Sequence, residues 1–257
     1  MLSLERKNFI LSELQTNKKV IVSELGKELG VSEETIRRDL EKICKDGSAV
    51  KIYGGAIIND STNIELPFNV RKKRNVEEKQ KIAAIIDSLI DENENIILDP
   101  STSAVFVAKV LKNTKKNLTV LTNSIETMIE LSNTTHWNVI SPGGSLKEGF
   151  LALSGPNTIA AFGMYNADKL VFSCKGIDIE KGVTDGSDMF SQTKQAMIKS
   201  AKTKILAVDH SKFDRISFSK ITELTALDIV VTDRKPEAKW LSCFRQNGIE
   251  CIYPTNE

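Results

Sequence analysis

The chain has 257 residues, of which 40% are hydrophobic and 27% are charged. This composition is typical of folded protein with one large or two ordinary domains, and it excludes disordered and fibrous chains. No apolar run approaches the roughly 20 residues that a membrane span requires, and the N-terminal MLSLERKNF is charged too early for a signal peptide. We therefore expect a soluble cytoplasmic protein.

The net charge does not indicate a polyanionic partner. The 35 Lys and Arg residues are balanced by 34 Asp and Glu residues, which leaves +1. Any binding to nucleic acid must therefore come from local concentrations of positive charge. Two are present, the Arg37-Arg38 pair and the run RKKR at residues 71–74.

Cysteine and histidine spacing gives no disulfide or metal signature. The 2 histidines are His136 and His210, and no CxxC motif occurs among the 4 cysteines, which are Cys44, Cys174, Cys243 and Cys251. A metal site in sequence needs ligands clustered at short spacings. We therefore expect no disulfide framework, no metal and no cofactor, and we interpret the thiols as small apolar side chains.

Three short helices are predicted at the N-terminus. Residues 4–15 carry apolar side chains at helical spacing, and residues 16–19 (TNKK) break that helix. Residues 22–29 form a second helix that Gly30 closes, and a third helix begins at Ser32. Two short helices joined by a tight glycine-containing turn are the sequence form of a helix-turn-helix, whose second helix enters the major groove.

Residues 31–47, which read VSEETIRRDLEKICKDG, are predicted to form an amphipathic helix. Its apolar stripe serves the core and its charged face is available to a partner. Ser32 is a suitable N-cap and Gly47 a suitable C-terminal stop. Taken alone, the stretch also fits an ordinary surface helix.

Residues 49–58 (AVKIYGGAII) place two β-prone arms around Gly54-Gly55, which predicts a hairpin, or wing, beside the third helix. The order of helix, VSEETIRRDL and Gly-Gly wing resembles the N-terminal domain of the DeoR family of bacterial transcriptional regulators. The residues that carry this resemblance are Val31, Ser32, Thr35, Arg37, Arg38 and Asp39.

A winged helix-turn-helix predicts binding to double-stranded operator DNA. Basic side chains of the third helix should contact phosphates and the groove, hydroxyls at its N-terminus should approach the backbone or base edges, and the hairpin should place the wing. The residues expected at the DNA are Ser32, Thr35, Arg37, Arg38, Lys42, Lys51 and Tyr53.

The polar residues 59–76, which include Pro67, are predicted to link a DNA-binding domain at residues 1–58 to a second domain at residues 77–257. The basic run at residues 71–74 allows two interpretations, an additional phosphate contact or a solvated approach to the next helix. We favour the solvated approach.

From residue 95 onward, short apolar strands alternate with helix-length segments. This alternation predicts βαβ units and a mainly parallel sheet, so the expected fold class is α/β with an N-terminal winged helix-turn-helix. Helices are expected at residues 76–92, 104–111, 125–131, 189–202 and 236–247. Strands are expected at residues 96–98, 118–121, 137–140, 170–173, 205–208, 229–231 and 249–253.

Ligands of open parallel sheets bind beyond the carboxyl ends of the strands. Polar or glycine-containing segments follow five expected strands: residues 99–103 (DPSTS), 122–124 (TNS), 143–144 (GG), 175–178 (KGID) and 209–213 (DHSKF). The first segment opens a helix, whose free N–H groups attract an anion, although alone it fits an ordinary capped loop equally well. Together the five segments predict a shared pocket.

These segments, together with PGGSL and the Thr193-Lys194 helix, resemble the sensor domain of the DeoR family. That domain is similar to ribose-5-phosphate isomerase, and the resemblance implies a phosphorylated sugar or related metabolite as effector. The effector-binding residues that it implies are Asp99, Ser101, Thr102, Ser103, Asn123, Gly143, Gly144, Lys175, Asp178, Lys194, Asp209 and Lys212.

The sequence also departs from the family pattern. Ser101 stands where glycine is common and narrows the anion-binding loop, and Ser103 replaces a second threonine. Against the isomerase pattern, the acidic cluster is reduced to Asp178, and Thr193 replaces the glutamate before lysine. Because isomerisation requires a carboxylate base, we favour a sensor over the alternative, an isomerase-like enzyme with a DNA-binding domain.

His210 follows Asp209, but no GxSxG nucleophile motif accompanies it. We therefore expect a structural or ligand-edge role for this histidine. The sequence as a whole predicts a non-enzymatic repressor of a sugar-metabolism operon, with activation or an unphosphorylated effector as open alternatives. Because one helix covers few base pairs, we expect a homo-oligomer, either a dimer or a tetramer.

Overall fold

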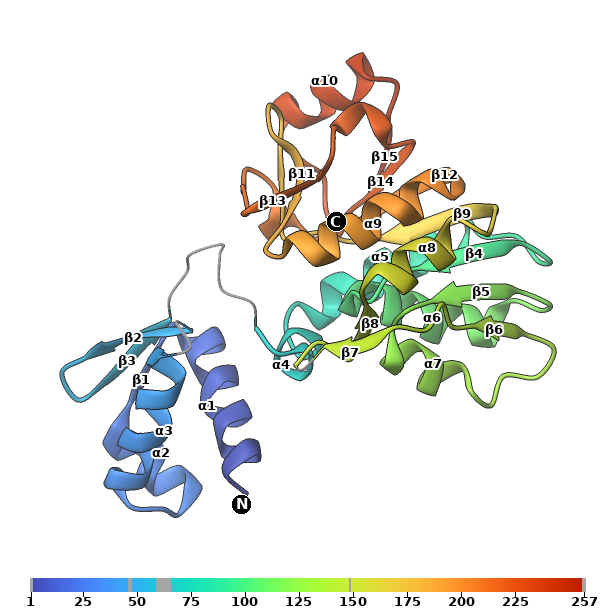
Figure 1. The fold of residues 1–257 in the computed structure, drawn as a ribbon. Coiled ribbons are helices and arrows are strands. Elements are labelled where there is room, and N and C mark those ends of the chain that lie inside the picture. Colours follow the sequence, from blue (N-terminus) through green and yellow to red (C-terminus); the bar gives the residue numbers. More distant parts are fainter. Residues whose placement is uncertain (1, 46–47, 59–65, 148, 256–257) are drawn as a thin grey trace. The chain divides into compact units, whose positions relative to one another are not determined.

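The computed structural model describes residues 2–45, 48–58, 66–147 and 149–255 (Figure 1). The chain divides into two compact units, Met1–Arg74 and Asn75–Glu257. Among the helices that the structure describes, none combines the length and the apolar character needed to cross a membrane.

In its described residues, the first unit has four helices and a small antiparallel sheet in the order β1-β3-β2. Its helices are α1 (Ser3–Asn17), α2 (Val22–Leu29), α3 (Glu33–Lys45) and α4 (Phe68–Lys72). Its strands are β1 (Lys19–Ile21), β2 (Ala49–Ile52) and β3 (Gly55–Ile58). The three predicted helices and the hairpin are therefore confirmed.

The ends of α2 and α3 follow the predicted capping chemistry. Gly30 ends α2 in the left-handed region at φ 64°, where glycine carries no steric penalty. Ser32 precedes α3, and its Oγ accepts a hydrogen bond from the Thr35 backbone N–H at 3.3 Å. The stop predicted at Gly47 lies outside the described residues. The apolar stripe of α3 is buried through Ile36, Leu40 and Ile43.

Strand β1 is a feature that the sequence did not predict, because it lies partly in the segment expected only to break the first helix. It pairs with β3 and so adds a third strand to the hairpin. At Gly55, an added Cβ would lie 1.9 Å from the Val20 carbonyl oxygen. The close approach of these two strands therefore requires glycine at this position.

Helix α4 lies within residues 59–76, which we expected to be a linker, and no helix was predicted there. Phe68 and Val70 are buried, and Val70 belongs to the core of the first unit. The helix packs on α1. Short helices of this kind are missed because five residues are too few to show a period.

A buried ion pair joins α1 to α3. Arg6 Nε lies 2.5 Å from Asp39 Oδ2, and both side chains are almost entirely removed from solvent. Asp39 is therefore turned into the unit, while the other charged residues of α3 face outward. The pair fixes α3 against α1.

The second unit is built on a seven-stranded parallel sheet in the order β15-β14-β12-β9-β4-β5-β6 (Figure 1). Its strands are β4 (Asn95–Leu98), β5 (Thr119–Thr122), β6 (Asn138–Ile140), β9 (Ala167–Phe172), β12 (Ala201–Ala207), β14 (Ile229–Val231) and β15 (Glu250–Ile252). The expected α/β class and the seven expected parallel strands are confirmed.

Helices cover both faces of this sheet. On one face, α5 (Val76–Asp87), α6 (Thr102–Thr114) and α7 (Ile125–Leu131) enclose one core. On the other face, a second core contains side chains of α8 (Pro156–Phe162), α9 (Asp188–Lys199) and α10 (Ala238–Gln246). Neighbouring residues of β4 alternate between the two cores, since Ile96 and Leu98 belong to the first and Ile97 to the second.

Five short strands were not predicted. An antiparallel sheet of order β10-β11-β13 and a hairpin of β7 and β8 lie outside the main sheet. Their bounds are β7 (Ser145–Lys147), β8 (Ala152–Ser154), β10 (Gly176–Asp178), β11 (Gly182–Asp185) and β13 (Ser219–Thr222). Two 3-10 turns, η1 (His210–Lys212) and η2 (Leu224–Ala226), complete the unit.

Asp39→Asn is expected to lower the free energy of unfolding of the first unit by about 3 kcal/mol, because it breaks the buried ion pair between Asp39 and the Arg6 guanidinium. Denaturant unfolding of the full chain, followed by circular dichroism, measures this loss.

Glu34→Gln is the matched control on the same helix. It breaks the exposed pair with Arg38, whose atoms lie 3.5 Å apart, so the loss should stay below about 1 kcal/mol. Equal losses in the two variants would contradict the importance assigned to the buried pair.

Candidate DNA interface and effector site

The predicted DNA-contacting side chains of α3 are exposed, and two of them are paired along the helix. Arg37 lies 2.8 Å from Glu33 and Arg38 lies 3.5 Å from Glu34, each at i,i+4 spacing. Lys42 is also exposed. Exposed pairs of this kind contribute about 1 kcal/mol or less, so the arginines can exchange their glutamates for DNA phosphates at small cost.

The wing is tied to α3 through one exposed pair. Lys51 on β2 lies 3.1 Å from Glu41 on α3, and Tyr53 in the turn between β2 and β3 is fully exposed. The hydroxyls of Ser32 and Thr35 lie 2.9 Å apart at the N-terminus of α3. The structure therefore gathers all seven predicted residues on α3, its N-terminal cap and the wing. Their contacts with DNA stay a prediction.

In the second unit, the order of the sheet strands reverses between β4 and β9. Successive strands proceed from β4 toward β6 on one side and from β9 toward β15 on the other, which makes this pair the topological switch point. Asp99 follows β4 here. Its Oδ1 accepts the Ser101 N–H at 3.1 Å, and its Oδ2 accepts the Ser173 N–H, also at 3.1 Å.

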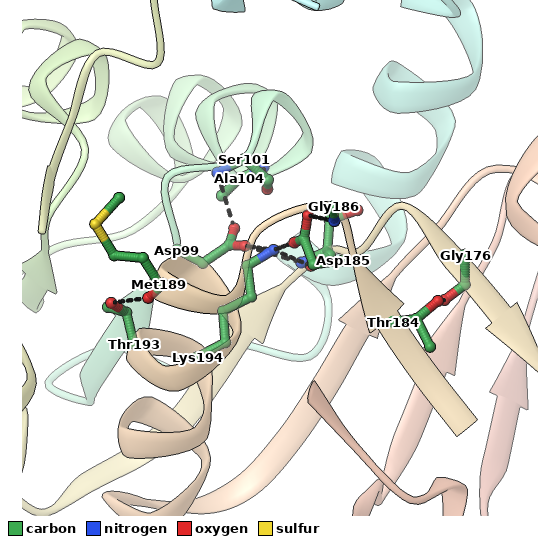
Figure 2. A network of polar contacts seen from close by, with 11 residues as sticks. Asp99, Ser101, Ala104, Gly176, Thr184, Asp185, Gly186, Met189, Thr193 and Lys194 are labelled. Atoms are coloured by element: carbon green, nitrogen blue, oxygen red, sulfur yellow. Dashed lines mark hydrogen bonds and ion pairs between the residues drawn. The ribbon is translucent and has the colours of Figure 1, made fainter. Parts of the chain in front are cut away.

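Lys194 of α9 reaches the same point (Figure 2). Its Nζ lies 2.5 Å from Asp185 Oδ2, 2.7 Å from the Ser173 carbonyl oxygen and 3.4 Å from Asp99 Oδ2. Asp185, at the end of β11, also accepts the Gly186 N–H at 2.8 Å. One buried ammonium thus joins β4, β9, β11 and α9.

The charges in this buried network stabilise one another. Burial lowers the pKa of Lys194, but Asp185 and Asp99 outweigh burial, so the pKa lies above its ordinary value. Burial raises the pKa of Asp185, and the ammonium of Lys194 reverses this, leaving the pKa lowered. Lys194 and Asp185 are therefore ionised near neutral pH, and Lys194 has no lone pair with which to act as a base.

The first turn of α6 provides anion-binding geometry beside this network. Ser101 is the N-cap, and its Oγ accepts the Ala104 N–H at 3.1 Å. Thr102 and Ser103 are buried in the first turn. Free N–H groups and the helix dipole favour negative charge at such an end. The side chain of Ser101 is used in capping, which accounts for serine at this position.

Two other predicted strand exits have different surroundings. Asn123 after β5 is fully buried, and its Nδ2 donates to the Leu153 carbonyl at 2.7 Å, while its Oδ1 has no hydrogen-bond partner in the described part of the chain. The carbonyl of Gly143 accepts from Thr158 Oγ1 at 2.7 Å. A Cβ on Gly144 would lie 2.0 Å from that hydroxyl oxygen, so this pair of glycines packs on α8.

Lys175 and Asp178 lie at opposite ends of one short segment. Lys175 follows β9 and is half-buried near the network, where its charge helps to lower the pKa of Asp185. Asp178 lies at the end of β10, and its Oδ1 accepts the N–H groups of Glu180 and Lys181 at 2.9 and 2.8 Å. Asp178 therefore closes a turn and is not part of the buried network.

The exit of β12 contacts the start of the second unit. Asp209 Oδ1 accepts from Asn75 Nδ2 at 3.1 Å and from the Ser211 N–H at 3.0 Å. Burial raises the pKa of Asp209, but the Lys212 charge and the Ser211 hydrogen bonds outweigh it, so the pKa is lowered. Asn75 is the first residue of the second unit, which places this predicted effector residue next to the connection between units.

Sequence reasoning missed Asp185 and Asn75. The strand that carries Asp185 is four residues long and belongs to the small antiparallel sheet, so no periodic pattern marked it. The sequence feature that could have marked Asp185 is TDG at residues 184–186, a polar, glycine-containing segment like the five segments that we did identify after strands. Asn75 was assigned to the linker. In the structure it is the N-cap residue of α5, with a left-handed backbone at φ 46°.

Thr193 stands at the position where the isomerase pattern has a glutamate, and its side chain has a structural contact. Thr193 Oγ1 donates to the Met189 carbonyl at 2.9 Å and is buried within α9. His210 Nδ1 lies 2.8 Å from Asp233 Oδ2, so a buried carboxylate orients the imidazole ring. The network thus organises the strand exits through hydrogen bonds and charge pairs.

Comparison with known proteins follows the same division into two units. The DeoR-like helix-turn-helix domain matches residues 6–62, and the DeoR C terminal sensor domain matches residues 74–234. The resemblance in VSEETIRRDL and in the strand exits is therefore confirmed.

Several curated proteins are similar over nearly the whole chain. The uncharacterized HTH-type transcriptional regulator YulB of Bacillus subtilis is 37% identical over 233 residues, covering 91% of this chain and 90% of that protein. The HTH-type transcriptional regulator GolR of Listeria innocua is 34% identical over 249 residues, covering 97% of this chain and 98% of that protein. The HTH-type transcriptional repressor GlcR of Bacillus subtilis is 32% identical over 248 residues, covering 96% of this chain and 95% of that protein.

Among solved structures, ribose 5-phosphate isomerase A from Methanocaldococcus jannaschii is 14% identical, with a TM-score of 0.40, over 54% of this chain and 55% of that chain. A likeness at this level has no bearing on activity. The fold and the family matches define a DNA-binding transcriptional regulator with a C-terminal sensor domain. The chain belongs to the DeoR family.

Arg38→Ala is expected to weaken DNA binding and to reduce the slope of log affinity against log salt by about one, because one phosphate contact is lost. Fluorescence anisotropy at several salt concentrations, on a site selected by the protein from random DNA, measures both quantities. Lys181→Ala, an exposed lysine in the second unit, is the control. An unchanged slope in Arg38→Ala would remove this residue from the interface.

Asp185→Asn is expected to destabilise the second unit by about 3 kcal/mol at pH 7, because it breaks a buried ion pair. A carboxylate whose folded pKa is lowered stabilises the fold above its ordinary pKa, and that contribution disappears as the pH falls through the lowered value. The deficit of the variant should therefore shrink below about pH 4.

Denaturant unfolding from pH 7 to pH 2 measures this dependence. Asp178→Asn is the control, since it only weakens the turn hydrogen bonds that the side-chain oxygen accepts and should cost about 1 kcal/mol or less. A deficit in Asp185→Asn that is constant with pH would contradict ionisation of the buried network.

Proposed function

We propose that this regulator is a cytoplasmic repressor of a sugar-metabolism operon and that a phosphorylated sugar, or a related phosphorylated metabolite, releases it from operator DNA. The relative GlcR, which is named a transcriptional repressor and is similar over 96% of this chain, supports repression.

The main support for a phosphorylated effector is the convergence of cationic groups and a helix N-terminus at the switch point. The first turn of α6 offers N–H groups beside a network that contains Lys194. Lys175 after β9 and Lys212 after β12 are half-buried. A phosphate dianion is stabilised by such N–H groups and by lysine charges, whereas a neutral sugar gains little from them.

The predicted effector residues then divide into two roles. Asp99 and Lys194 bind each other and Ser173, so they organise the loop that receives the ligand. The main-chain groups of Thr102 and Ser103, together with Lys212, contact the phosphate, and the unpartnered Oδ1 of Asn123 accepts a sugar hydroxyl. Gly143, Gly144 and Asp178 support the walls of the site.

Operator binding requires more than one chain. A single recognition helix reads few base pairs, and related folds bind two half-sites about one helical turn apart through a two-fold dimer. A homo-oligomer, dimeric or tetrameric, therefore presents α3 twice. An effector that changes the relative placement of the two α3 helices with a coupling free energy of about 1–3 kcal/mol changes operator affinity by about 5- to 150-fold.

Lys212→Ala is expected to abolish most of the thermal stabilisation that an effector gives, because the variant loses a phosphate contact while operator binding without effector stays unchanged. A thermal-shift screen of the full chain against pentose and hexose phosphates, each beside its unphosphorylated sugar, first identifies the effector.

Lys116→Ala is the matched control, since Lys116 is an exposed lysine that follows α6. It should respond to effector as the unchanged chain does. Stabilisation by an unphosphorylated sugar alone would contradict the phosphate proposal, and an unchanged shift in Lys212→Ala would show that the site lies elsewhere.

A further inference from the structure

Three side chains of types that bind metal ions converge in the second unit, away from the Lys194 network. Glu78 lies near the start of α5, His210 follows β12 at the start of η1, and Asp233 follows β14. One ligand atom of each residue lies within 4.8 Å of the other two. Within the described part of the chain, this is the single group of three or more such residues with ligand atoms this close together.

Asp233 holds the histidine in place. Its Oδ1 accepts the His210 backbone N–H at 2.6 Å, and its Oδ2 lies 2.8 Å from His210 Nδ1. The Asp233 side chain is only 5% exposed. His210 Nδ1 and Asp233 Oδ2 are therefore held in place before an ion binds, so these side chains lose little conformational entropy on binding.

The charges of the cluster are incompletely balanced. Glu78 is half-buried, and the structure shows no hydrogen bond or ion pair for its carboxylate with any described residue. Among the described residues, the ionisable partner of Asp233 is His210, which is neutral unless protonated, and Thr232 Oγ1 also donates to Asp233 Oδ1 at 3.4 Å. Two carboxylates thus face one imidazole, and buried or half-buried carboxylates are stabilised by a paired cation.

The donor atoms select the kind of cation. An imidazole nitrogen with two carboxylate oxygens suits Zn²⁺ and similar divalent transition-metal ions, whereas Mg²⁺ and Ca²⁺ prefer oxygen ligands alone. Three protein ligands also leave one position for water or a ligand group. We propose that Glu78, His210 and Asp233 bind one divalent transition-metal ion, Zn²⁺ being the representative, at His210 Nδ1, with the proton of the neutral imidazole on Nε2.

The ligands come from positions 78, 210 and 233, so no short sequence spacing marks the site. That is why we expected no metal from the sequence. The position has a structural consequence, because Glu78 lies three residues after Asn75, the first residue of the second unit. Bound metal joins the beginning of α5 to the exits of β12 and β14, and it therefore stabilises the start of the second unit.

The test uses the full chain, stripped of metal with a chelator and examined without DNA or sugar, so that it is independent of the proposed effector. Isothermal titration with Zn²⁺ should give one ion per chain. Co²⁺ should give visible absorption bands that report nitrogen and oxygen ligands. Zn²⁺ should raise the unfolding temperature by several degrees, and Mg²⁺ at the same concentration should not.

Two variants locate the site. Glu78→Gln removes one ligand, keeps the His210–Asp233 pair, and should weaken Zn²⁺ binding at least 10-fold. His210→Ala should abolish the Co²⁺ bands. His136→Ala is the matched control, because His136 is the only other histidine in the chain and is exposed, and it should bind as the unchanged chain does.

The four cysteines are free thiols in the structure and are the competing source of zinc binding. Retention of full Zn²⁺ affinity in both Glu78→Gln and His210→Ala would assign binding to thiols and overturn the proposal. Absence of stoichiometric binding by the unchanged chain would also overturn it, and would leave the three residues as a hydrogen-bonded cluster.

Discussion

The second unit depends on one buried ammonium. Lys194 of α9 binds Asp185 at the end of β11, the Ser173 carbonyl after β9 and Asp99 after β4, so four elements meet at one nitrogen. Removing any partner leaves a charge in a place where water does not reach, which is costly. The network therefore fixes the switch point of the sheet, and the loop that opens α6 takes its geometry from Asp99. A ligand at this loop interacts with groups whose positions are already determined.

The first unit uses buried charge in a comparable way. Arg6 and Asp39 join α1 to α3, while the remaining charges of α3 are exposed and paired with neighbours that DNA phosphates can replace. Asn75, the first residue of the second unit, donates to Asp209 at a strand exit. Under the proposed function, an effector that alters this exit would act on the residues that follow the DNA-binding unit in the chain.

Much of this organisation could be predicted from the sequence. The helix-turn-helix, the wing and the seven parallel strands follow from apolar periodicity and glycine positions, which are local properties. Strands β1 and β11 belong to small antiparallel sheets, and their formation depends on partners distant in sequence. Asp185 was missed for that reason. Asp178 was given a ligand role because it shares a motif with Lys175, yet its carboxylate closes a turn. Whether an aspartate joins the buried network depends on its burial in the folded chain, and a sequence motif does not specify burial.

The central claim is that a metabolite bound at the switch point of the sheet controls the affinity of α3 for DNA. Fluorescence anisotropy of operator DNA with the unchanged chain, titrated in the presence and absence of the effector found by thermal shift, tests this claim most directly. Our account predicts that a saturating phosphorylated sugar weakens operator binding by about 5- to 150-fold, with no effect of the unphosphorylated sugar. Operator affinity that is the same with and without a bound phosphorylated sugar would contradict the account.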